Sequence, residues 1–216
     1  MTAEKRFIAV AGNMGAGKST LVGLLAKHYN WNAVLEAVDT SSPDLTNPYL
    51  DDFFNDMARW SFNLQVFFLT ARFKQHRAIQ AGARSAIQDR TIYEDAEIFA
   101  RNLYEMNMMS ERDFKTYQMI YNEFTTLLKP PDLVIYLQAS IPKLVANIEK
   151  RARAYESKVK LDYLKRLQVC YESWYNQYSL GKKILINVDS LDFLERSDDL
   201  NVVIERIERE LFGLFA

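Results

Sequence analysis

The feature that most constrains the fold of this chain is a cluster of glycines near the start of the sequence. Three of the seven glycines, Gly12, Gly15 and Gly17, lie within six residues of one another, although glycine costs conformational entropy wherever it is ordered. They belong to the segment GNMGAGKS over 12–19, which fits the pattern G-x-x-x-x-G-K-[ST]. The apolar run over 6–11 predicts a buried strand before this segment, and the pattern over 18–29 predicts a helix after it. A glycine-rich turn between a strand and a helix predicts an anion-binding loop in an α/β protein.

The side chains at the end of this motif indicate which anion the loop binds. Lys18 would reach the β- and γ-phosphates of a nucleoside triphosphate, and the Ser19 hydroxyl would bind Mg²⁺. A glycine-rich turn that binds nothing is the alternative, and the strand–turn–helix context disfavours it. The loop residues expected to bind the nucleotide are Gly12, Asn13, Met14, Gly15, Ala16, Gly17, Lys18, Ser19 and Thr20.

Strand-like apolar runs alternate with helical patterns along the rest of the chain. Further strands are expected over 33–38, 85–88, 132–137 and 183–188, and helices over 50–81 with a break near Asn55–Asp56, 92–107, 111–128, 141–154, 160–180 and 198–213. Strands separated by helices predict a parallel sheet with helices on both faces. Nothing marks an internal boundary, so we expect a single doubly wound α/β domain over 1–216, whose core buries roughly 70% of the unfolded surface.

Composition excludes several classes of function. Lys+Arg 27 against Asp+Glu 28 gives a formal net charge of -1, which removes the bulk electrostatic argument for binding nucleic acid or an anionic membrane. Cys170 is alone, and His28 and His76 are far apart, so an intrachain disulfide is excluded and a structural zinc site is disfavoured. No segment reads as a signal peptide, and none reaches the ~18 apolar residues of a membrane span. We therefore expect a soluble cytoplasmic protein.

An Asp-Arg pair, Asp89–Arg90, follows the third expected strand. The sequence has no N-K-x-D guanine motif, and Gln138 stands where a motor-type ATPase would have an acid. Ligands bind at the carboxyl ends of parallel strands. There Asp89 would contact Mg²⁺ through water, and Arg90 would neutralise charge on a phosphoryl group in transfer. A helix-capping Asp with a solvated Arg is the alternative.

Two other charged segments are candidates for the same edge of the sheet. Glu36 follows a strand-like run, where a base must lie to take a proton from an attacking hydroxyl; a capping or surface acid is the alternative. The basic segment KRARAYESK over 150–158 lies between two expected helices. It fits either a solvated helix end or a lid, over about 150–159, that closes Arg151 and Arg153 over the phosphates.

The helix over 60–78 is apolar nearly all round, so we expect it to be buried. It nevertheless carries Gln65 and Arg72, which lie on one face about 10 Å apart along the axis. A buried amide and a buried guanidinium need partners. An amide flanked by aromatic residues suits the edge of a stacked base, whereas an internally bonded Gln and a structural Arg ion pair are the alternative.

Taken in order, these residues resemble the deoxynucleoside kinase family, and above all its bacterial deoxyadenosine and deoxyguanosine kinases. The matching segments run from Ile8 to about Phe193: GNMGAGKST over 12–20, EAV over 36–38, FNLQ over 62–65, Arg72, DRT over 89–91 with Asp95, and RAR over 151–153 with Glu156. The loop by itself is generic, whereas the ordered set is specific to the family. The resemblance implies a three-layer P-loop kinase fold with a five-stranded parallel sheet flanked by helices, and a short arginine-containing lid.

The resemblance also implies a role for each matching residue. Glu36 is similar to the general base that activates the sugar 5′-hydroxyl, and Arg90 to the arginine that positions that hydroxyl and the transferring phosphate. Gln65 resembles the amide that reads the base, and Arg72 with Asp95 the charged pair beside the base edge. The remaining contacts implied by the resemblance are Phe99 stacked on the base, Phe54 and Phe68 in the substrate site, Glu156 on the 3′-hydroxyl, and the lid arginines Arg151 and Arg153.

One position departs from the family pattern. Eleven residues before the base-reading Gln, the family usually has a Tyr whose hydroxyl helps to hold the sugar 3′-hydroxyl, and this chain has Phe54. Tyr49 or Tyr155 is a candidate to replace it, and looser discrimination at the sugar is the alternative. The family's Glu-Pro-Val is Glu36-Ala37-Val38 here, and this change keeps Glu36, the expected general base.

The sequence therefore predicts an enzyme that uses ATP and Mg²⁺ to phosphorylate the 5′-hydroxyl of a deoxynucleoside in nucleotide salvage, with deoxyadenosine first among purines. A nucleoside monophosphate kinase, such as a thymidylate kinase, shares the loop, the Asp-Arg pair and a lid, but Glu36 would repel an acceptor phosphate. A nucleotide-binding regulatory module without phosphotransfer is a third interpretation, and such a module needs neither the general base nor the lid. The resemblance implies a homodimer, and no nucleic-acid or membrane partner is expected.

Overall fold

Five strands form one parallel sheet at the centre of the computed structural model, which describes residues 4–36, 47–151 and 158–213. The order across the sheet is β2-β3-β1-β4-β5, and all four neighbouring pairs are parallel. The strands are β1 (Phe7–Gly12), β2 (Asn32–Val34), β3 (Ala86–Asp89), β4 (Leu133–Gln138) and β5 (Lys182–Asn187). The five-stranded parallel sheet expected from the sequence is confirmed.

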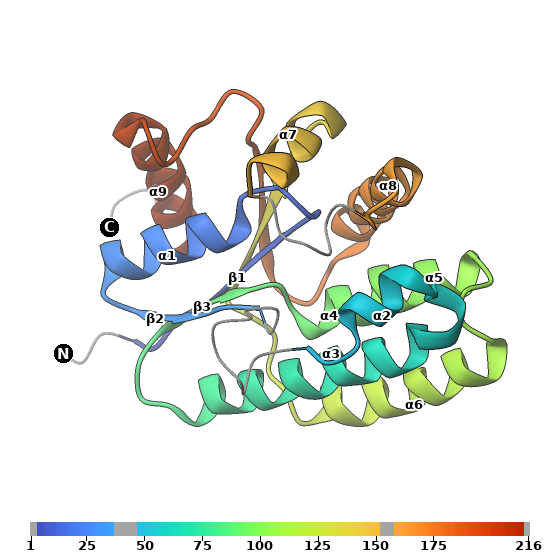
Figure 1. Cartoon of the computed structure of the whole chain (residues 1–216). Helices are drawn as coiled ribbons and strands as arrows, with labels where there is room; N and C mark the ends of the chain where they lie inside the picture. The colour runs from blue at the N-terminus through green and yellow to red at the C-terminus, as the bar shows by residue number, and fades with distance from the viewer. Residues whose placement is uncertain (1–3, 37–46, 152–157, 214–216) are drawn as a thin grey trace.

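Helices cover both faces of this sheet, which is the middle of three layers (Figure 1). One face is covered by α1 (Lys18–Tyr29), α7 (Ile141–Arg151) and α9 (Ser197–Phe212). The other face carries α2 (Leu50–Asn55), α3 (Met57–Ala81), α4 (Ile92–Glu94), the π-helix η2 (Asp95–Ala100), α5 (Arg101–Glu105), α6 (Glu111–Thr126) and α8 (Leu161–Gln177). Among the described residues, no helix has the length and hydropathy to cross a membrane.

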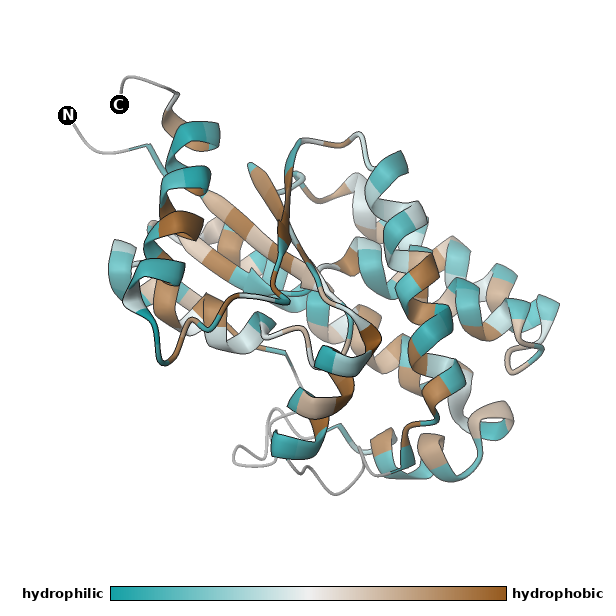
Figure 2. Cartoon of the chain, turned by 90° about the horizontal axis from the view of Figure 1, so that it is seen from above, coloured by the Kyte–Doolittle hydropathy of each residue, from teal (hydrophilic) through white to brown (hydrophobic). Residues whose placement is uncertain are grey.

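The central strand β1 shows how the sequence makes two cores. Its residues are all buried, and successive side chains point to opposite faces of the sheet. Ile8 and Val10 enter the core under α1, α7 and α9, whereas Ala9 and Ala11 enter the core under α3, α6 and α8. The strands are mostly hydrophobic along their length, while the helices alternate hydrophobic and hydrophilic residues (Figure 2). A sheet buried on both faces requires this pattern.

The expected helices and strands are found, with shifts of a few residues at their ends. The break near Asn55–Asp56 is confirmed, because α2 ends at Asn55 and the Asp56 carboxylate caps α3. β2 is shorter than the expected strand and ends at Val34; 37–38 lie outside the described residues. The segment expected as one helix over 92–107 contains the π-helix η2. Such a wide turn re-aims the side chains that follow it, and it is frequent at functional sites.

The Asp56 cap gives a prediction about stability. Asp56 Oδ1 accepts a hydrogen bond from the backbone N–H of Arg59 at 3.0 Å. Asp56→Ala should lower the free energy of unfolding by ~1 kcal/mol, because alanine leaves that N–H without its acceptor. Urea denaturation followed by circular dichroism measures the change. Asp56→Asn keeps an acceptor and is the control, so equal losses in the two variants would contradict the cap.

Candidate active site

The loop between β1 and α1 has a backbone that its glycines permit. Gly15 and Gly17 have φ angles of 81° and 90°, in the left-handed region that favours glycine. A Cβ at Gly15 would lie 2.6 Å from the carbonyl oxygen of Leu144 in α7. Asn147 of α7 donates to the Gly15 carbonyl at 2.8 Å. The loop is therefore fixed against α7, at the carboxyl edge of the sheet where ligands bind in open α/β folds.

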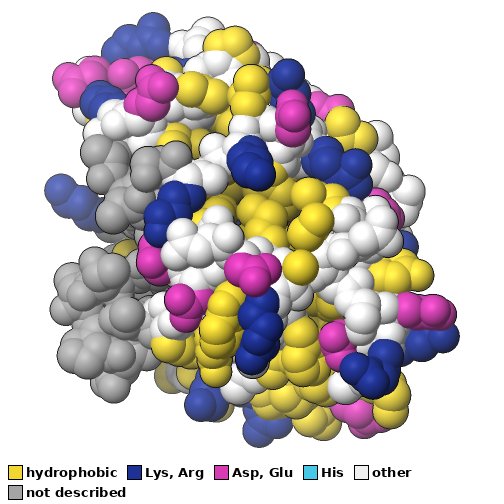
Figure 3. All heavy atoms as spheres, turned by 45° about the vertical axis from the view of Figure 1, so that its right-hand side comes forward, with side chains coloured by type: hydrophobic (Ala, Val, Ile, Leu, Met, Phe, Trp, Pro, Cys, Tyr) yellow, Lys and Arg dark blue, Asp and Glu magenta, His cyan; other side chains and the backbone are white. Residues whose placement is uncertain are grey.

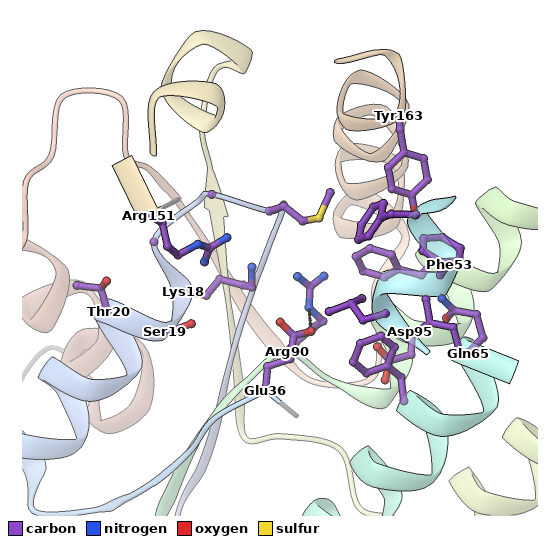
Figure 4. Close-up of a pocket in the computed structure, with 18 residues that line it drawn as sticks. Lys18, Ser19, Thr20, Glu36, Phe53, Gln65, Arg90, Asp95, Arg151 and Tyr163 are labelled. Atoms are coloured by element: carbon purple, nitrogen blue, oxygen red, sulfur yellow. Dashed lines mark ion pairs between the residues drawn. The ribbon is translucent and has the colours of Figure 1, made fainter. Parts of the chain in front are cut away.

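A cavity extends from this loop across the carboxyl ends of the strands (Figure 4). It encloses about 980 Å³, including the part open to solvent. Lys18, Ser19, Thr20 and Arg151 lie at one end, and Glu36 and Arg90 lie near the middle. The other end is largely apolar, with polar groups on Gln65, Asp95 and Tyr163 and with Leu50, Phe53, Phe54, Leu64, Phe68 and Phe99 in the same lining. The cavity thus joins a glycine-loop end with cationic side chains, which suits phosphate, to an end that suits a planar apolar group.

Two guanidinium groups converge on one oxygen of Glu36 in the middle of the cavity. Arg72 Nη2 donates to Glu36 Oε1 at 2.8 Å. Arg90 Nε lies 2.9 Å from the same oxygen, in an ion pair that lacks hydrogen-bond geometry. The arginine side chains are 1% and 5% exposed, whereas that of Glu36 is 18% exposed. The carboxylate is therefore held from behind and reachable from the cavity.

Arg72 lies behind the cavity wall rather than in it. Its Nε donates to Asp95 Oδ2 at 3.1 Å, and its Nη1 donates to the Asp89 carbonyl at 2.9 Å. With the bond to Glu36, each of its three nitrogens has a partner. Asp95, not Arg72, is the member of this pair that lines the cavity. Burial raises the pKa of Asp95 to about 7, although Arg72 opposes that rise.

Ser19 and Asp89 come together beside the loop. Ser19 Oγ donates to Asp89 Oδ2, while the buried Asp89 Oδ1 has no hydrogen-bond partner among the described residues. A hydroxyl and a carboxylate are the hard oxygen donors that Mg²⁺ prefers, and Mg²⁺ in such sites completes its shell with water and phosphate oxygens. In the part of the chain that the structure describes, no three His, Cys, Asp or Glu side chains group into a metal site. The donor set fits an ion held jointly with a nucleotide.

Lys18 is buried at the glycine-loop end of the cavity, where its Nζ donates to the Asn13 carbonyl at 3.0 Å. Burial, reinforced by the charge of Arg90, lowers the pKa of Lys18 to about 8, and the carboxylates of Asp89 and Glu36 oppose this. Phosphates placed at the loop would raise that pKa again, because negative charge favours the ammonium form. The titration of Lys18 is therefore coupled to ligand binding.

Gln65 supplies the buried polar group at the apolar end. Its side chain is 3% exposed, and its Oε1 has no hydrogen-bond partner among the described residues. Phe68 and Phe99 line the same end, and the Phe99 ring lies 4.5 Å from the Arg90 guanidinium carbon. An unsatisfied buried acceptor between aromatic rings suits an N–H donor on a flat ligand.

The described candidates from the sequence gather in this one region. Arg151 is the last residue of α7 and lines the cavity. Arg153 and Glu156, and with them Tyr155 and most of the expected lid, lie outside the described residues. Tyr49, a candidate to replace the hydroxyl missing at Phe54, is not among the residues that line the cavity, and its ring contacts Trp60 and Phe67.

Sequence reasoning missed two tyrosines of α8. Tyr163 lines the cavity, and the Tyr171 hydroxyl accepts a hydrogen bond from Arg90 Nη1 at 2.6 Å. Both lie on the buried stripe of α8 with Leu164, Leu167 and Trp174. Nothing in their spacing separates them from ordinary core residues. The one available signal was that α8 follows the basic segment and so returns the chain to the site.

Similarity to known proteins extends over nearly the whole chain. A family model for deoxynucleoside kinase matches residues 8–212. The chain is 34% identical to a deoxyadenosine/deoxycytidine kinase of Bacillus subtilis (strain 168), over 94% of this chain and 92% of the relative. It is 35% identical to a deoxyadenosine kinase of Lactobacillus acidophilus, over 94% and 95%. Its fold matches that of the deoxyadenosine kinase from M. mycoides with bound dATP, with a TM-score of 0.80, 29% identity and coverage of 94% and 99%.

Nucleotide binding should take up protons through Lys18 when the solution is near the pKa of that residue. Near pH 8, about half of the unliganded protein holds a neutral Lys18, so binding of MgATP without acceptor should take up ~0.5 proton. Near pH 6.5 Lys18 is already charged before MgATP binds, so binding should take up no proton through this residue. Calorimetry in buffers of different ionisation enthalpy measures the protons. Lys18→Arg keeps the charge but cannot titrate, so an unchanged uptake in that variant would exclude Lys18 as the source.

Proposed function

The chain belongs to the deoxynucleoside kinase family and is an ATP-dependent deoxynucleoside kinase, and we propose that its preferred acceptor is deoxyadenosine. The observation that carries the proposal is the cavity, in which Glu36 and Arg90 lie between a phosphate loop and an apolar chamber. A nucleoside with its base in that chamber would direct its 5′-hydroxyl towards Glu36. Relatives and a fold neighbour named for deoxyadenosine support this choice of base.

In the proposed reaction, Glu36 is the general base. Its carboxylate takes the proton of the 5′-hydroxyl as the 5′-oxygen bonds to the γ-phosphorus and the bond from that phosphorus to ADP breaks. The two arginines that hold Glu36 fix the direction of its carboxylate before substrate arrives. Arg90 and Lys18, both at the cavity, supply positive charge where the transferring phosphoryl group carries negative charge.

Mg²⁺ is part of the proposal. Ser19 and, through water, Asp89 would hold it, and when bound it would neutralise charge on the β- and γ-phosphates. The unpartnered buried Oδ1 of Asp89 supports this assignment. Arg151, together with Arg153 of the expected lid, would add positive charge at the phosphates; Arg151 lines the cavity at that end.

Base and sugar recognition are assigned to the apolar end of the cavity. Gln65 Oε1 would accept from the exocyclic amine of adenine, with Asp95 beside it and Phe99 and Phe68 against the ring faces. Phe54 lines the chamber without offering a hydroxyl. The family resemblance assigns Glu156 to the 3′-hydroxyl, and we retain that assignment as part of the proposal.

The wider setting of the enzyme is also inferred. We propose a single kinase domain over 1–216 that acts as a homodimer in the cytoplasm, supported by the family resemblance and by the lone Cys170. On the face seen in Figure 3, Lys and Arg are interspersed with Asp and Glu rather than gathered by sign. This supports small molecules rather than nucleic acid as partners. Light scattering with multi-angle detection tests the dimer.

A turnover assay with ATP and Mg²⁺ tests the acceptor. We expect deoxyadenosine to be phosphorylated with the highest kcat/KM in a panel of four deoxynucleosides and their ribonucleoside forms. Deoxyadenosine monophosphate should not be an acceptor, because Glu36 would face its phosphate. Preferential phosphorylation of the monophosphate would overturn the proposal in favour of a nucleoside monophosphate kinase.

Glu36→Gln tests the proposed general base. Glutamine keeps the shape and the acceptor oxygen for Arg72 but cannot take a proton. We expect kcat to fall by ~10²–10⁴ while binding of deoxynucleoside changes little. Steady-state kinetics combined with calorimetric binding of the acceptor separates the two effects. Near-normal turnover would remove Glu36 from the catalytic role.

The pair Arg72 and Asp95 should influence which base is accepted. In Arg72→Met with Asp95→Ala, turnover should fall for every acceptor, because Arg72 also holds Glu36. Beyond that common loss, deoxyadenosine should lose about 5- to 150-fold more kcat/KM than thymidine, since its edge depends on the deleted polar groups. The ratio of kcat/KM for the two acceptors is the measurement. An unchanged ratio would leave the pair a purely structural role.

A further inference from the structure

The backbone of Arg90 is in an unusual conformation for a residue that carries a side chain. Its φ is 72°, in the left-handed region that non-glycine residues rarely adopt. The residue directly follows β3, and its N–H donates to the Val10 carbonyl of β1 at 2.9 Å. Such conformations persist where the surroundings hold them, often at functional sites. The contacts that hold Arg90 in place are therefore relevant to the function of the site.

A tyrosine hydroxyl holds one end of the Arg90 guanidinium. Arg90 Nη1 donates to Tyr171 Oη at 2.6 Å, and Tyr171 Oη donates to Glu94 Oε1 at 2.9 Å. Guanidinium has only donors, so the tyrosine oxygen must accept from Arg90 and turn its own proton towards Glu94. All three side chains are buried. The direction of each bond in this relay is therefore fixed.

Glu94 anchors the relay to the turn that carries Arg90. Its second oxygen, Oε2, accepts from the Thr91 N–H at 2.8 Å and from the Thr91 hydroxyl at 3.1 Å. The Glu94 N–H donates in turn to the Thr91 hydroxyl at 3.2 Å, and this bond forms the capping box of α4 together with the one from the Thr91 N–H. Three donors thus converge on one carboxylate with no exposed surface. The relay runs from Arg90 through α8 and returns to the residue next to Arg90, which leaves the guanidinium little freedom to rotate.

Aromatic packing holds the same groups in place from the sides. The Tyr171 ring stacks on Tyr136 of β4 with centroids 5.8 Å apart and an interplanar angle of 4°. Phe99 meets the Tyr171 ring edge-on, at 6.2 Å, and lies against the Arg90 guanidinium. The tyrosine is fixed by the sheet, and the arginine is fixed by the tyrosine.

We propose that Tyr171, supported by Glu94, is a positioning residue that orients the Arg90 guanidinium for phosphoryl transfer. The inference rests on the proposed function of Arg90. Tyr171 is not among the residues that line the cavity, so it acts on the reaction through the arginine. A guanidinium fixed before substrate binds stabilises charge in the transition state without reorganising. Removal of the hydroxyl should then lower turnover more than it weakens binding.

Tyr171→Phe is the direct test, because phenylalanine keeps the ring contacts and removes only the hydroxyl. We expect kcat to fall by about 10- to 100-fold. KM for both substrates should change less than about 3-fold, since a transition-state interaction is the one removed. Tyr178→Phe is the matched control: Tyr178 is a buried tyrosine directly after α8 whose hydroxyl has no hydrogen-bond partner among the described residues. That variant should keep wild-type kcat, and thermal unfolding verifies that both variants are folded.

A double-mutant cycle separates positioning from a structural role. In an Arg90→Met background the Tyr171 hydroxyl has no guanidinium to orient, so Tyr171→Phe should change kcat by less than about 2-fold. The same fold-loss in both backgrounds, or an unchanged kcat in folded Tyr171→Phe, would overturn the proposal. The acceptor in every arm is the deoxynucleoside that the wild type phosphorylates fastest. A preference other than deoxyadenosine would therefore revise the proposed substrate and leave this test intact.

Discussion

The site depends on one shared contact, the two guanidinium groups of Arg72 and Arg90 on a single oxygen of Glu36. Each partner comes from a different place in the chain: Glu36 just after β2, Arg72 from α3, and Arg90 just after β3. The two arginine side chains are buried and their charges are opposite to that of Glu36, so the contact joins three segments that lie far apart in the chain. The contact therefore fixes where α3 lies against the edge of the sheet as well as the direction of the carboxylate.

The same cluster shows why the site is arranged for a ligand rather than for stability. Lys18, Arg72 and Arg90 are buried near one another, and the charge of Arg90 helps to lower the pKa of Lys18. Burial that lowers the pKa of Lys18 costs stability in the unliganded protein, because the charged form is less favourable there than in the unfolded chain. The phosphates of a nucleotide would supply the missing negative charge at the loop. Nucleotide binding and protonation of Lys18 should therefore favour each other.

The sequence was sufficient for the fold because its signals are local. Apolar runs, helical periodicity and the glycine loop each specify an element within about a dozen residues. The pairing of Arg72 with Asp95 followed from the family resemblance and is present in the structure at 3.1 Å. The contacts of Arg72 with Glu36 and of Arg90 with Tyr171 join residues 36 and 81 positions apart. Nothing local encodes such contacts, because they depend on how α3 and α8 pack and on the π-helix η2 that no periodicity revealed.

Arg72 connects the two ends of the cavity, and this connection affects how specificity is expressed. Its Nε bonds to Asp95 at the apolar end, and its Nη2 bonds to Glu36 in the middle. If Asp95 contacts the nucleobase as proposed, a base that disturbs it would pull on the same guanidinium that holds the Glu36 carboxylate. Recognition of the nucleobase would then alter the position of Glu36, the proposed general base, as well as the affinity for the nucleoside. Binding energy from a part of the substrate remote from the reacting atoms can raise kcat when it helps to position the catalytic groups, rather than only lowering KM. Discrimination between bases in this enzyme is therefore expected in turnover as well as in binding.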